Sequence, residues 1–111
     1  MKSSVGIPKS FLIALVLPCA CTALTRGVNE NAPVPDIMMV MRSRTSLETL
    51  ETGHGVYMRK CGECHTHLLP SEITSEDWHV IVPGMAWNAG IDPVEEKALL
   101  KYLIAAKKTS L

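Results

Sequence analysis

Two cysteines three positions apart, followed directly by a histidine, constrain this chain more than any other feature. Cys61, Cys64 and His65 form a C-x-x-C-H motif in a chain of 111 residues that has only two other cysteines, Cys19 and Cys21. That length allows one domain at most, and so small a domain buries a modest fraction of its surface. Small domains commonly depend on a disulfide, a metal or a cofactor. We therefore expect the motif to supply covalent or metal support for the fold.

The C-x-x-C-H pattern is typical of the covalent attachment of a c-type haem. The two intervening residues place both thiols on one helical turn, at the separation of the haem vinyl groups, with which thiols form thioethers. The next residue, His65, then lies beneath the iron, and imidazole is a common axial ligand of haem iron. We therefore expect one covalent haem c, attached through Cys61 and Cys64.

Three other uses of the two thiols are open at this stage. A thioredoxin-like redox pair is expected beside a βαβ pattern, and the sequence has none. A zinc site would need His67 and His79 to complete it, because no second cysteine pair follows. A structural disulfide between Cys61 and Cys64 would suit an oxidising compartment. The N-terminal segment and a downstream methionine favour haem among these uses.

The first 23 residues have the order of an export signal. Lys2 and Lys9 precede an uninterrupted apolar run at 11–17, and small residues follow at 19–23. The run is much shorter than the ~20 residues of a membrane-spanning helix. A buried core helix is the alternative, but charge, apolar run and small residues in that order favour a signal at 1–23.

Two ways of processing this signal fit the sequence. Cleavage after Ala23 would leave a soluble periplasmic protein. Alternatively, residues 17–21 resemble a bacterial lipoprotein box in which Cys21 is acylated, with Pro18 in place of the usual aliphatic residue. An acylated Cys21 would hold the chain at a membrane surface, since a buried acyl chain contributes about 0.8 kcal/mol per CH₂. Both predict a protein outside the cytoplasm.

Residues 24–44 are expected to form a linker, and residues 45–111 the folded domain. The prolines and polar residues at 29–36 show no helical or strand period. The apolar run Ile37–Met41 interrupts the linker and predicts a short helix or turn that packs on the domain. A methionine-rich metal or partner site is the alternative for this run.

A first helix is expected to lead into the motif. Ser46 is a suitable N-cap, and residues recur at helical spacing after it at Leu47, Leu50, Tyr57 and Cys61. Gly53 shares this stripe and costs about 1 kcal/mol relative to alanine. A close crossing by another helix would offset that cost.

Two more helices are predicted downstream. Asp92 and Pro93 begin a C-terminal helix, whose apolar stripe is Val94, Ala98, Leu99, Tyr102, Leu103 and Ala106. Its Tyr102 is the expected partner of Gly53. Between the motif and this helix, Thr74 caps a short helix that Pro83 is expected to end.

This arrangement resembles the small single-haem cytochromes c of the class I type. Those proteins have a helix running into C-x-x-C-H, a loop with an axial methionine, and a C-terminal helix that crosses the first. The resemblance covers residues 46–108, through the motif and Gly53, Tyr57, Trp78, Met85, Ala89, Gly90, Glu95, Leu99, Leu100, Tyr102 and Leu103. It implies an all-α domain in which three or four short helices wrap around one covalent haem.

The resemblance also implies the ligands. Cys61 and Cys64 bind the vinyl groups, His65 is the proximal ligand and Met85 the distal one. Only 19 residues separate His65 from Met85, fewer than in a typical class I chain, so one haem edge is expected to be unusually exposed.

Other residues around the haem are weighed from the sequence. His79 is the rival sixth ligand, and an open sixth position is a further alternative. Tyr57 and Trp78 are expected to line the pocket, and Trp87 is expected in the pocket or core. His67 lies too near His65 to reach the opposite haem face, so an exposed or hydrogen-bonded loop position is expected.

A haem iron with ligands on both faces exchanges one electron without making bonds, so we expect an electron carrier and not an enzyme. A haem-based ligand binder or sensor is the alternative if the sixth ligand is labile. The partners would be redox proteins. Nucleic acid is not expected, because residues 24–111 carry nine Lys and Arg against eleven Asp and Glu.

Overall fold

The computed structural model describes residues 31–109. Its elements are α1 (Ile37–Ser43), α2 (Leu47–Lys60), the 3₁₀ turn η1 (Pro70–Glu72), α3 (Ser75–Ala89) and α4 (Pro93–Lys107). The described part of the chain contains no strand, so the prediction of an all-α domain with three or four short helices is confirmed. The expected export signal at 1–23, with Cys21, lies outside the described residues.

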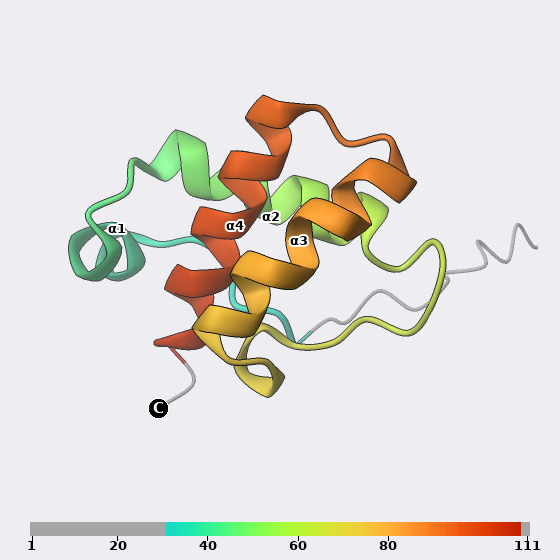
Figure 1. Cartoon of the computed structure of the whole chain (residues 1–111). Helices are drawn as coiled ribbons and strands as arrows, with labels where there is room; N and C mark the ends of the chain where they lie inside the picture. The colour runs from blue at the N-terminus through green and yellow to red at the C-terminus, as the bar shows by residue number, and fades with distance from the viewer. Residues whose placement is uncertain (1–30, 110–111) are drawn as a thin grey trace, which may run out of the picture.

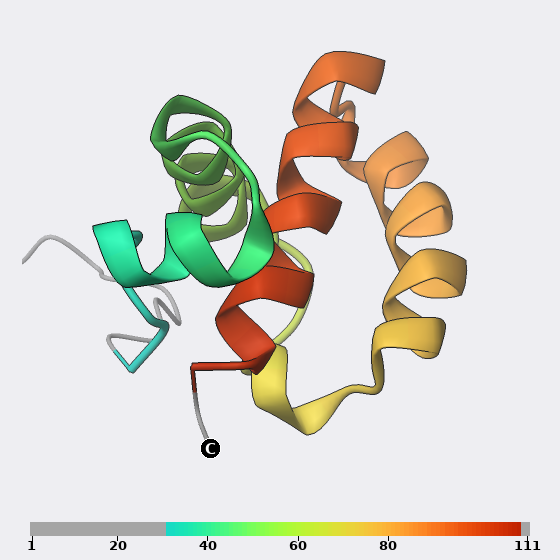
Figure 2. The same cartoon turned by 90° about the vertical axis from the view of Figure 1, so that its left-hand side faces the viewer.

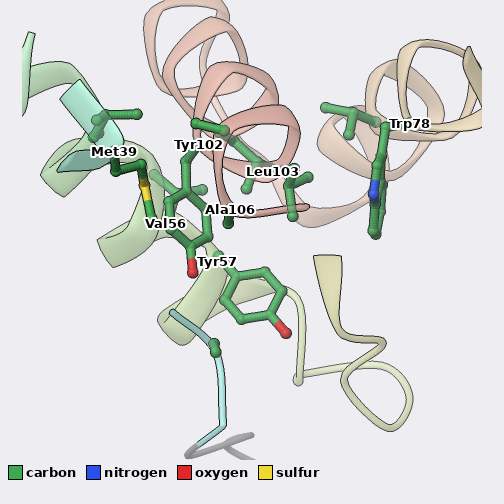
Figure 3. Packing of buried hydrophobic residues seen from close by; sticks show 12 residues of the cluster. Met39, Val56, Tyr57, Trp78, Tyr102, Leu103 and Ala106 are labelled. Atoms are coloured by element: carbon green, nitrogen blue, oxygen red, sulfur yellow. The ribbon is translucent and has the colours of Figure 1, made fainter. Parts of the chain in front are cut away.

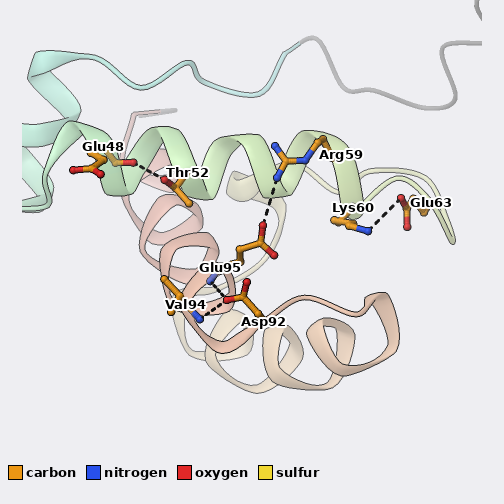
Figure 4. Close-up of polar contacts among 8 residues, drawn as sticks. All are labelled: Glu48, Thr52, Arg59, Lys60, Glu63, Asp92, Val94 and Glu95. Atoms are coloured by element: carbon orange, nitrogen blue, oxygen red, sulfur yellow. Dashed lines mark hydrogen bonds and ion pairs between the residues drawn. The ribbon is translucent and has the colours of Figure 1, made fainter.

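The crossing of α2 and α4 organises the domain (Figures 1 and 2). A Cβ atom added to Gly53 would lie 2.1 Å from the backbone oxygen of Ala98 and 2.7 Å from Cβ of Tyr102. The predicted contact between Gly53 and Tyr102 is therefore confirmed. An exposed ion pair between Arg59 and Glu95 also joins the two helices, at 3.6 Å (Figure 4), although such exposed pairs stabilise proteins little.

Large apolar side chains from both helices fill the space around this crossing (Figure 3). The largest fully buried ones from these two helices are Tyr57, Tyr102, Leu50, Leu103 and Val56, and Met39 of α1 and Trp78 of α3 are buried in the same cluster. The rings of Tyr57 and Tyr102 lie 5.7 Å apart in a tilted arrangement, a geometry that aromatic pairs prefer. Leu47 and Val94, both expected on apolar stripes, are exposed because they lie in the first turns of α2 and α4, outside the crossing.

The helix α1 packs against α4 and α2. Its Met39 is buried, and the carboxylate of Asp36 caps the helix by accepting the Met39 N–H at 2.7 Å. The prediction of a short packed helix at Ile37–Met41 is confirmed. Just before it, the Tyr102 hydroxyl donates to the carbonyl of Pro33 at 2.8 Å. The packed part of the chain therefore includes residues from the expected linker at 24–44.

Side-chain caps fix where the three longer helices begin. The predicted N-caps Ser46, Thr74 and Asp92 each accept backbone N–H bonds from the first turn of their helix. Figure 4 shows the Asp92 carboxylate with the N–H groups of Val94 and Glu95, at 2.8 and 2.9 Å. These starts follow from local chemistry, since the first N–H groups of a helix have no carbonyl partner within it.

The prediction that Pro83 ends its helix is wrong, because α3 continues to Ala89 with Pro83 inside it. Trp78, Val82 and Ala86 recur every four residues and are all buried, so one apolar stripe runs across the proline. Pro83 itself lies on the exposed side. Burial along the stripe offsets the roughly 3 kcal/mol that an interior proline costs.

Candidate haem-attachment site

The C-x-x-C-H motif continues α2 as a turn. Cys61 is the C-cap of the helix, with helical backbone angles, and its N–H donates to the carbonyl of Tyr57 at 3.2 Å. Two residues on, the Glu63 N–H donates to the carbonyl of Lys60. This local geometry places both thiols near the end of one helix, as predicted. In this structure Cys61 and Cys64 are both free thiols.

The two thiols differ in environment. Cys61 is half-buried and Cys64 is exposed. Burial raises the pKa of the Cys61 thiol to about 11. A thioredoxin-like pair needs the opposite, namely a thiol whose pKa is lowered at a helix N-terminus or by a cation. The C-terminal end of α2 therefore does not favour that use of Cys61.

An apolar pocket opens beside the motif and brings four predicted residues together. Cys61, Cys64, His65 and Met85 all line it. The pocket has a cavity volume of about 200 Å³, which is below the ~300–1,000 Å³ of most pockets that hold small molecules and cofactors. Its other walls come from α3, α4 and the turn between them, and are Trp78, Val82, Asn88, Ala89, Ile91, Leu99 and Leu103, with Lys60 from α2.

A second, smaller cavity adjoins the first. It is lined by Tyr57 and Leu68 together with Cys61, His65, Trp78 and Met85, and the last four also line the larger pocket. Tyr57 and Trp78, the two predicted pocket residues, thus both line cavities beside the motif. Of these two aromatic residues, Trp78 lines both cavities and Tyr57 only the smaller one.

The orientation of the His65 ring suits a metal ligand. Its Nδ1 lies 2.8 Å from the carbonyl oxygen of Thr66. A carbonyl can only accept, so Nδ1 carries a proton, and in the neutral ring Nε2 then keeps its lone pair. Histidines that bind metals commonly hold their second nitrogen in this way, which fixes both tautomer and ring orientation.

A stacked pair behind the motif supports the turn. The His67 ring stacks on Tyr57 with 4.7 Å between centroids, and its Nε2 lies 2.9 Å from the Tyr57 carbonyl oxygen. The Tyr57 hydroxyl donates to the carbonyl of Leu68 at 2.9 Å. The prediction of a hydrogen-bonded loop position for His67 is confirmed, but the ring is also buried. Its partner, Tyr57, is ten residues away in the sequence.

The two tryptophans of α3 have different positions. Trp78 is buried, and its indole N–H donates to the carbonyl of Pro70 at 3.1 Å. Trp87 is 86% exposed, so its expected place in the pocket or core is wrong. The reason is helical geometry, since the inward stripe of Trp78, Val82 and Ala86 places residue 87 about 100° away from it.

Met85 and His79, the two candidate sixth ligands, also have different positions on α3. Met85 was expected on a loop after a helix break, but it lies on α3, one turn beyond Val82, and lines both cavities while remaining 38% exposed. His79 is exposed, and its Nδ1 lies 2.7 Å from the carbonyl oxygen of Ser75. Of these two residues, only Met85 is in the pocket lining.

The donor set suits a covalent haem. Two thiols, one imidazole with a free Nε2 and one thioether line a single apolar pocket. A zinc site from the same cysteines would need His67 and His79, whose rings are hydrogen-bonded elsewhere. Within residues 31–109, no three His, Cys, Asp or Glu side chains converge to hold a metal ion. A haem iron requires no such cluster, because the porphyrin supplies its equatorial ligands.

Part of the pocket wall does not follow from the predicted elements. Asn88 and Ala89 line the pocket and follow Met85 by one helical turn. A predicted helix that continued past Pro83 would have placed them on the same side as Met85. Leu99 and Leu103 were predicted on the apolar stripe of the C-terminal helix, and both are buried and also line the pocket.

Comparisons with known proteins found no protein-family model, no curated protein and no solved structure that matches this chain. Within residues 31–109, no helix is long and apolar enough to span a bilayer.

Proposed function

We propose that this chain is a single-electron carrier of the cytochrome c type, with one haem c bound through Cys61 and Cys64. The observation that carries the proposal is that one apolar pocket collects both thiols, His65 and Met85. These four residues come from the C-cap of α2, the turn that follows it, and the C-terminal half of α3. Their convergence supports the C-x-x-C-H motif with a second ligand that the motif alone does not provide.

Each residue has a role in this proposal. The thiols attach the group covalently, and Nε2 of His65 is the proximal ligand, held in place by the bond from Nδ1 to the Thr66 carbonyl. The thioether of Met85 is the distal ligand. When bound, haem c supplies one-electron chemistry, and His/Met ligation raises its reduction potential.

The surrounding side chains determine what the site excludes. Val82, Leu99 and Leu103 line the pocket with aliphatic groups, which keep water away and lower the local dielectric constant. With ligands on both faces no position stays open for a substrate, so the proposal is a carrier that docks with redox proteins and not an enzyme. The exposed Cys64 and Met85 support an exposed haem edge on that side.

The location is part of the proposal. An exported periplasmic protein, soluble or acylated at Cys21, fits the N-terminal 23 residues and the oxidising, haem-attaching compartment that the motif requires. The mass of the mature N-terminus distinguishes the two forms.

The first test is the visible spectrum of the protein made in a host that exports it and attaches haem. We expect a coloured protein whose mass is increased by one haem, and a colourless Cys61→Ser/Cys64→Ser variant. A colourless parent protein after correct maturation would overturn the proposal and favour a thiol or zinc module.

The second test concerns the sixth ligand. Met85→Ala should abolish the weak long-wavelength band that a methionine–iron bond gives in the oxidised protein. His79→Ala, on the same helix but outside the pocket lining, is the matched control and should leave that band unchanged. Carbon monoxide binding to the reduced parent protein would instead favour the sensor function with a labile Met85.

A further inference from the structure

The outer face of α1 is apolar and exposed. Ile37, Met38 and Met41 are 66%, 52% and 68% exposed, whereas Met39 on the inner face is 1% exposed. At 100° per residue, positions 37, 38 and 41 fall within an arc of about 100°. Because Met39 and the half-buried Val40 already attach α1 to the domain, packing within residues 31–109 leaves this outer arc open to a partner.

Basic residues border the exposed arc at the C-terminal end of α1. Arg42 and Arg44, at the end of α1, are exposed, and the groove beside them is lined by Lys101 and Lys108 of α4 and its C-cap. The acidic residue of α1, Asp36, lies at the opposite end of the helix, where its carboxylate accepts the Met39 N–H. An apolar face with arginine and lysine at its border is the pattern of a helix that lies in the interface of an anionic membrane.

The sequence upstream of α1 also favours a membrane as the partner of this face. Cys21, the proposed acylation site, precedes the first described residue, Asn31, by nine intervening residues. Fully extended, they span about 33 Å, so an acyl anchor there would keep α1 close to the bilayer. Three apolar side chains bind a membrane weakly by themselves. Once an acyl anchor holds the chain at the bilayer, however, the contact between α1 and the lipid becomes intramolecular, and the effective concentration of α1 at the membrane rises.

We propose that the outer face of α1 (Ile37, Met38 and Met41, bordered by Arg42 and Arg44) rests on an anionic membrane surface and orients the domain. Figures 1 and 2 show α1 on one side of the α2–α4 pair and α3 on the other. In this orientation α3 and the pocket beside it face away from the lipid, toward soluble redox proteins. The membrane contact itself is independent of haem, whereas its use in presenting a haem rests on the proposed function.

Hydrogen exchange on vesicles tests this contact. The haem-loaded mature chain, with a hexahistidine tag in place of Cys21, is attached to vesicles of phosphatidylcholine and phosphatidylglycerol through a nickel-chelating lipid. We expect the amides of residues 37–44 to exchange about tenfold more slowly than in the free protein, since a tenfold change corresponds to a contact of about 1.4 kcal/mol. Amides of α3 should be unchanged.

Two variants separate the membrane contact from other effects. Ile37→Gln/Met41→Gln should remove the slowing without altering exchange of α1 in the free protein. Val80→Gln is the matched control, because Val80 is also highly exposed but lies on α3, and it should retain the slowing. The visible spectrum of each variant reports the haem site separately, so failure of the membrane contact is distinguishable from failure of the proposed function.

Other outcomes would overturn the proposal. Unchanged exchange of residues 37–44 on the vesicles means that α1 does not touch lipid. Slowing without vesicles that increases with protein concentration, and that the Ile37→Gln/Met41→Gln pair abolishes, means that a second copy of the chain covers α1. Equal slowing on vesicles of phosphatidylcholine alone would remove the role of Arg42 and Arg44.

Discussion

At Gly53, the absence of a side chain decides how closely α2 approaches α4. The nearest atoms to an added Cβ include backbone atoms of Ala98, at 2.1 and 2.6 Å, and backbone cannot rotate away as a side chain can. We predict that Gly53→Ala destabilises the domain by about 3 kcal/mol or more, because the overpacking cost exceeds the helix propensity that alanine gains. Chemical denaturation measures this change.

Gly55, two residues further along the same helix, is the control for that substitution. A Cβ there would meet the guanidinium end of Arg59 at 3.0 Å, which is flexible and exposed. We expect Gly55→Ala to stabilise the protein by about 0.5–1 kcal/mol. Equal effects of the two substitutions would contradict the close crossing of α2 and α4 at Gly53.

Because Tyr57 and Tyr102 are buried, the stability of the fold is expected to decrease at alkaline pH. Burial raises the pKa of both, and that of Tyr57 reaches about 12 in the chain with free thiols, where the negative charges of Cys61 and Glu72 make smaller contributions. The folded state therefore holds protons that the unfolded state releases above pH ~10. Stability from these groups is complete below that pH and decreases as pH rises toward about 12.

This pH dependence can be measured in urea unfolding series across the alkaline range. We predict a loss of up to about 2 kcal/mol for each tyrosine over that interval. Tyr57→Phe has no ionisable hydroxyl at this position and should show a shallower decrease. A parent protein with constant stability through this range would contradict the burial of both rings.

In α3, the glycine within the helix and the glycine that ends it have opposite backbone requirements. Gly84 lies within the helix, and Gly90 follows it with φ +64°, a left-handed conformation. An added Cβ meets nothing within 4 Å at either position, so the two substitutions isolate backbone effects. We predict that Gly84→Ala stabilises by about 1 kcal/mol and Gly90→Ala destabilises by about 1 kcal/mol, measured by thermal unfolding.

The same helix shows where local signals and tertiary packing disagree. Thr74 correctly predicts the start of α3, because a cap acts within one turn. Pro83 wrongly predicts its end, because the cost of an interior proline is local while the gain from burying Val82 and Ala86 depends on α4. The predicted loop position of Met85 is wrong for the same reason, since Met85 lies on a helix face.

At the scale of the whole molecule, the proposed haem would serve as part of the core. Without it, the apolar walls formed by Val82, Leu99 and Leu103 face an open pocket. We predict that the haem-free Cys61→Ser/Cys64→Ser variant unfolds at least about 10 °C below the haem-loaded parent, corresponding to roughly 2 kcal/mol in a domain of this size. Circular dichroism on heating measures both proteins.

A comparison with Met85→Ala controls for cysteine chemistry. That variant keeps both thioethers and should unfold between the other two proteins, because the pocket stays filled while one ligand is lost. Identical unfolding temperatures for the parent and the double cysteine variant would contradict a haem in this pocket.

The amino-acid sequence was enough to predict the starts of the three longer helices, the contact of Gly53 with Tyr102, and the placement of two thiols and His65 near one helix end. These follow from capping groups, hydrophobic periodicity and spacing, which act over a few residues. Only the tertiary structure decided the length of α3, the burial of His67 against Tyr57, the exposure of Trp87, and the convergence of Met85 with the motif. Each of these depends on which distant segments exclude water from one another, and neighbours in the chain do not encode that choice.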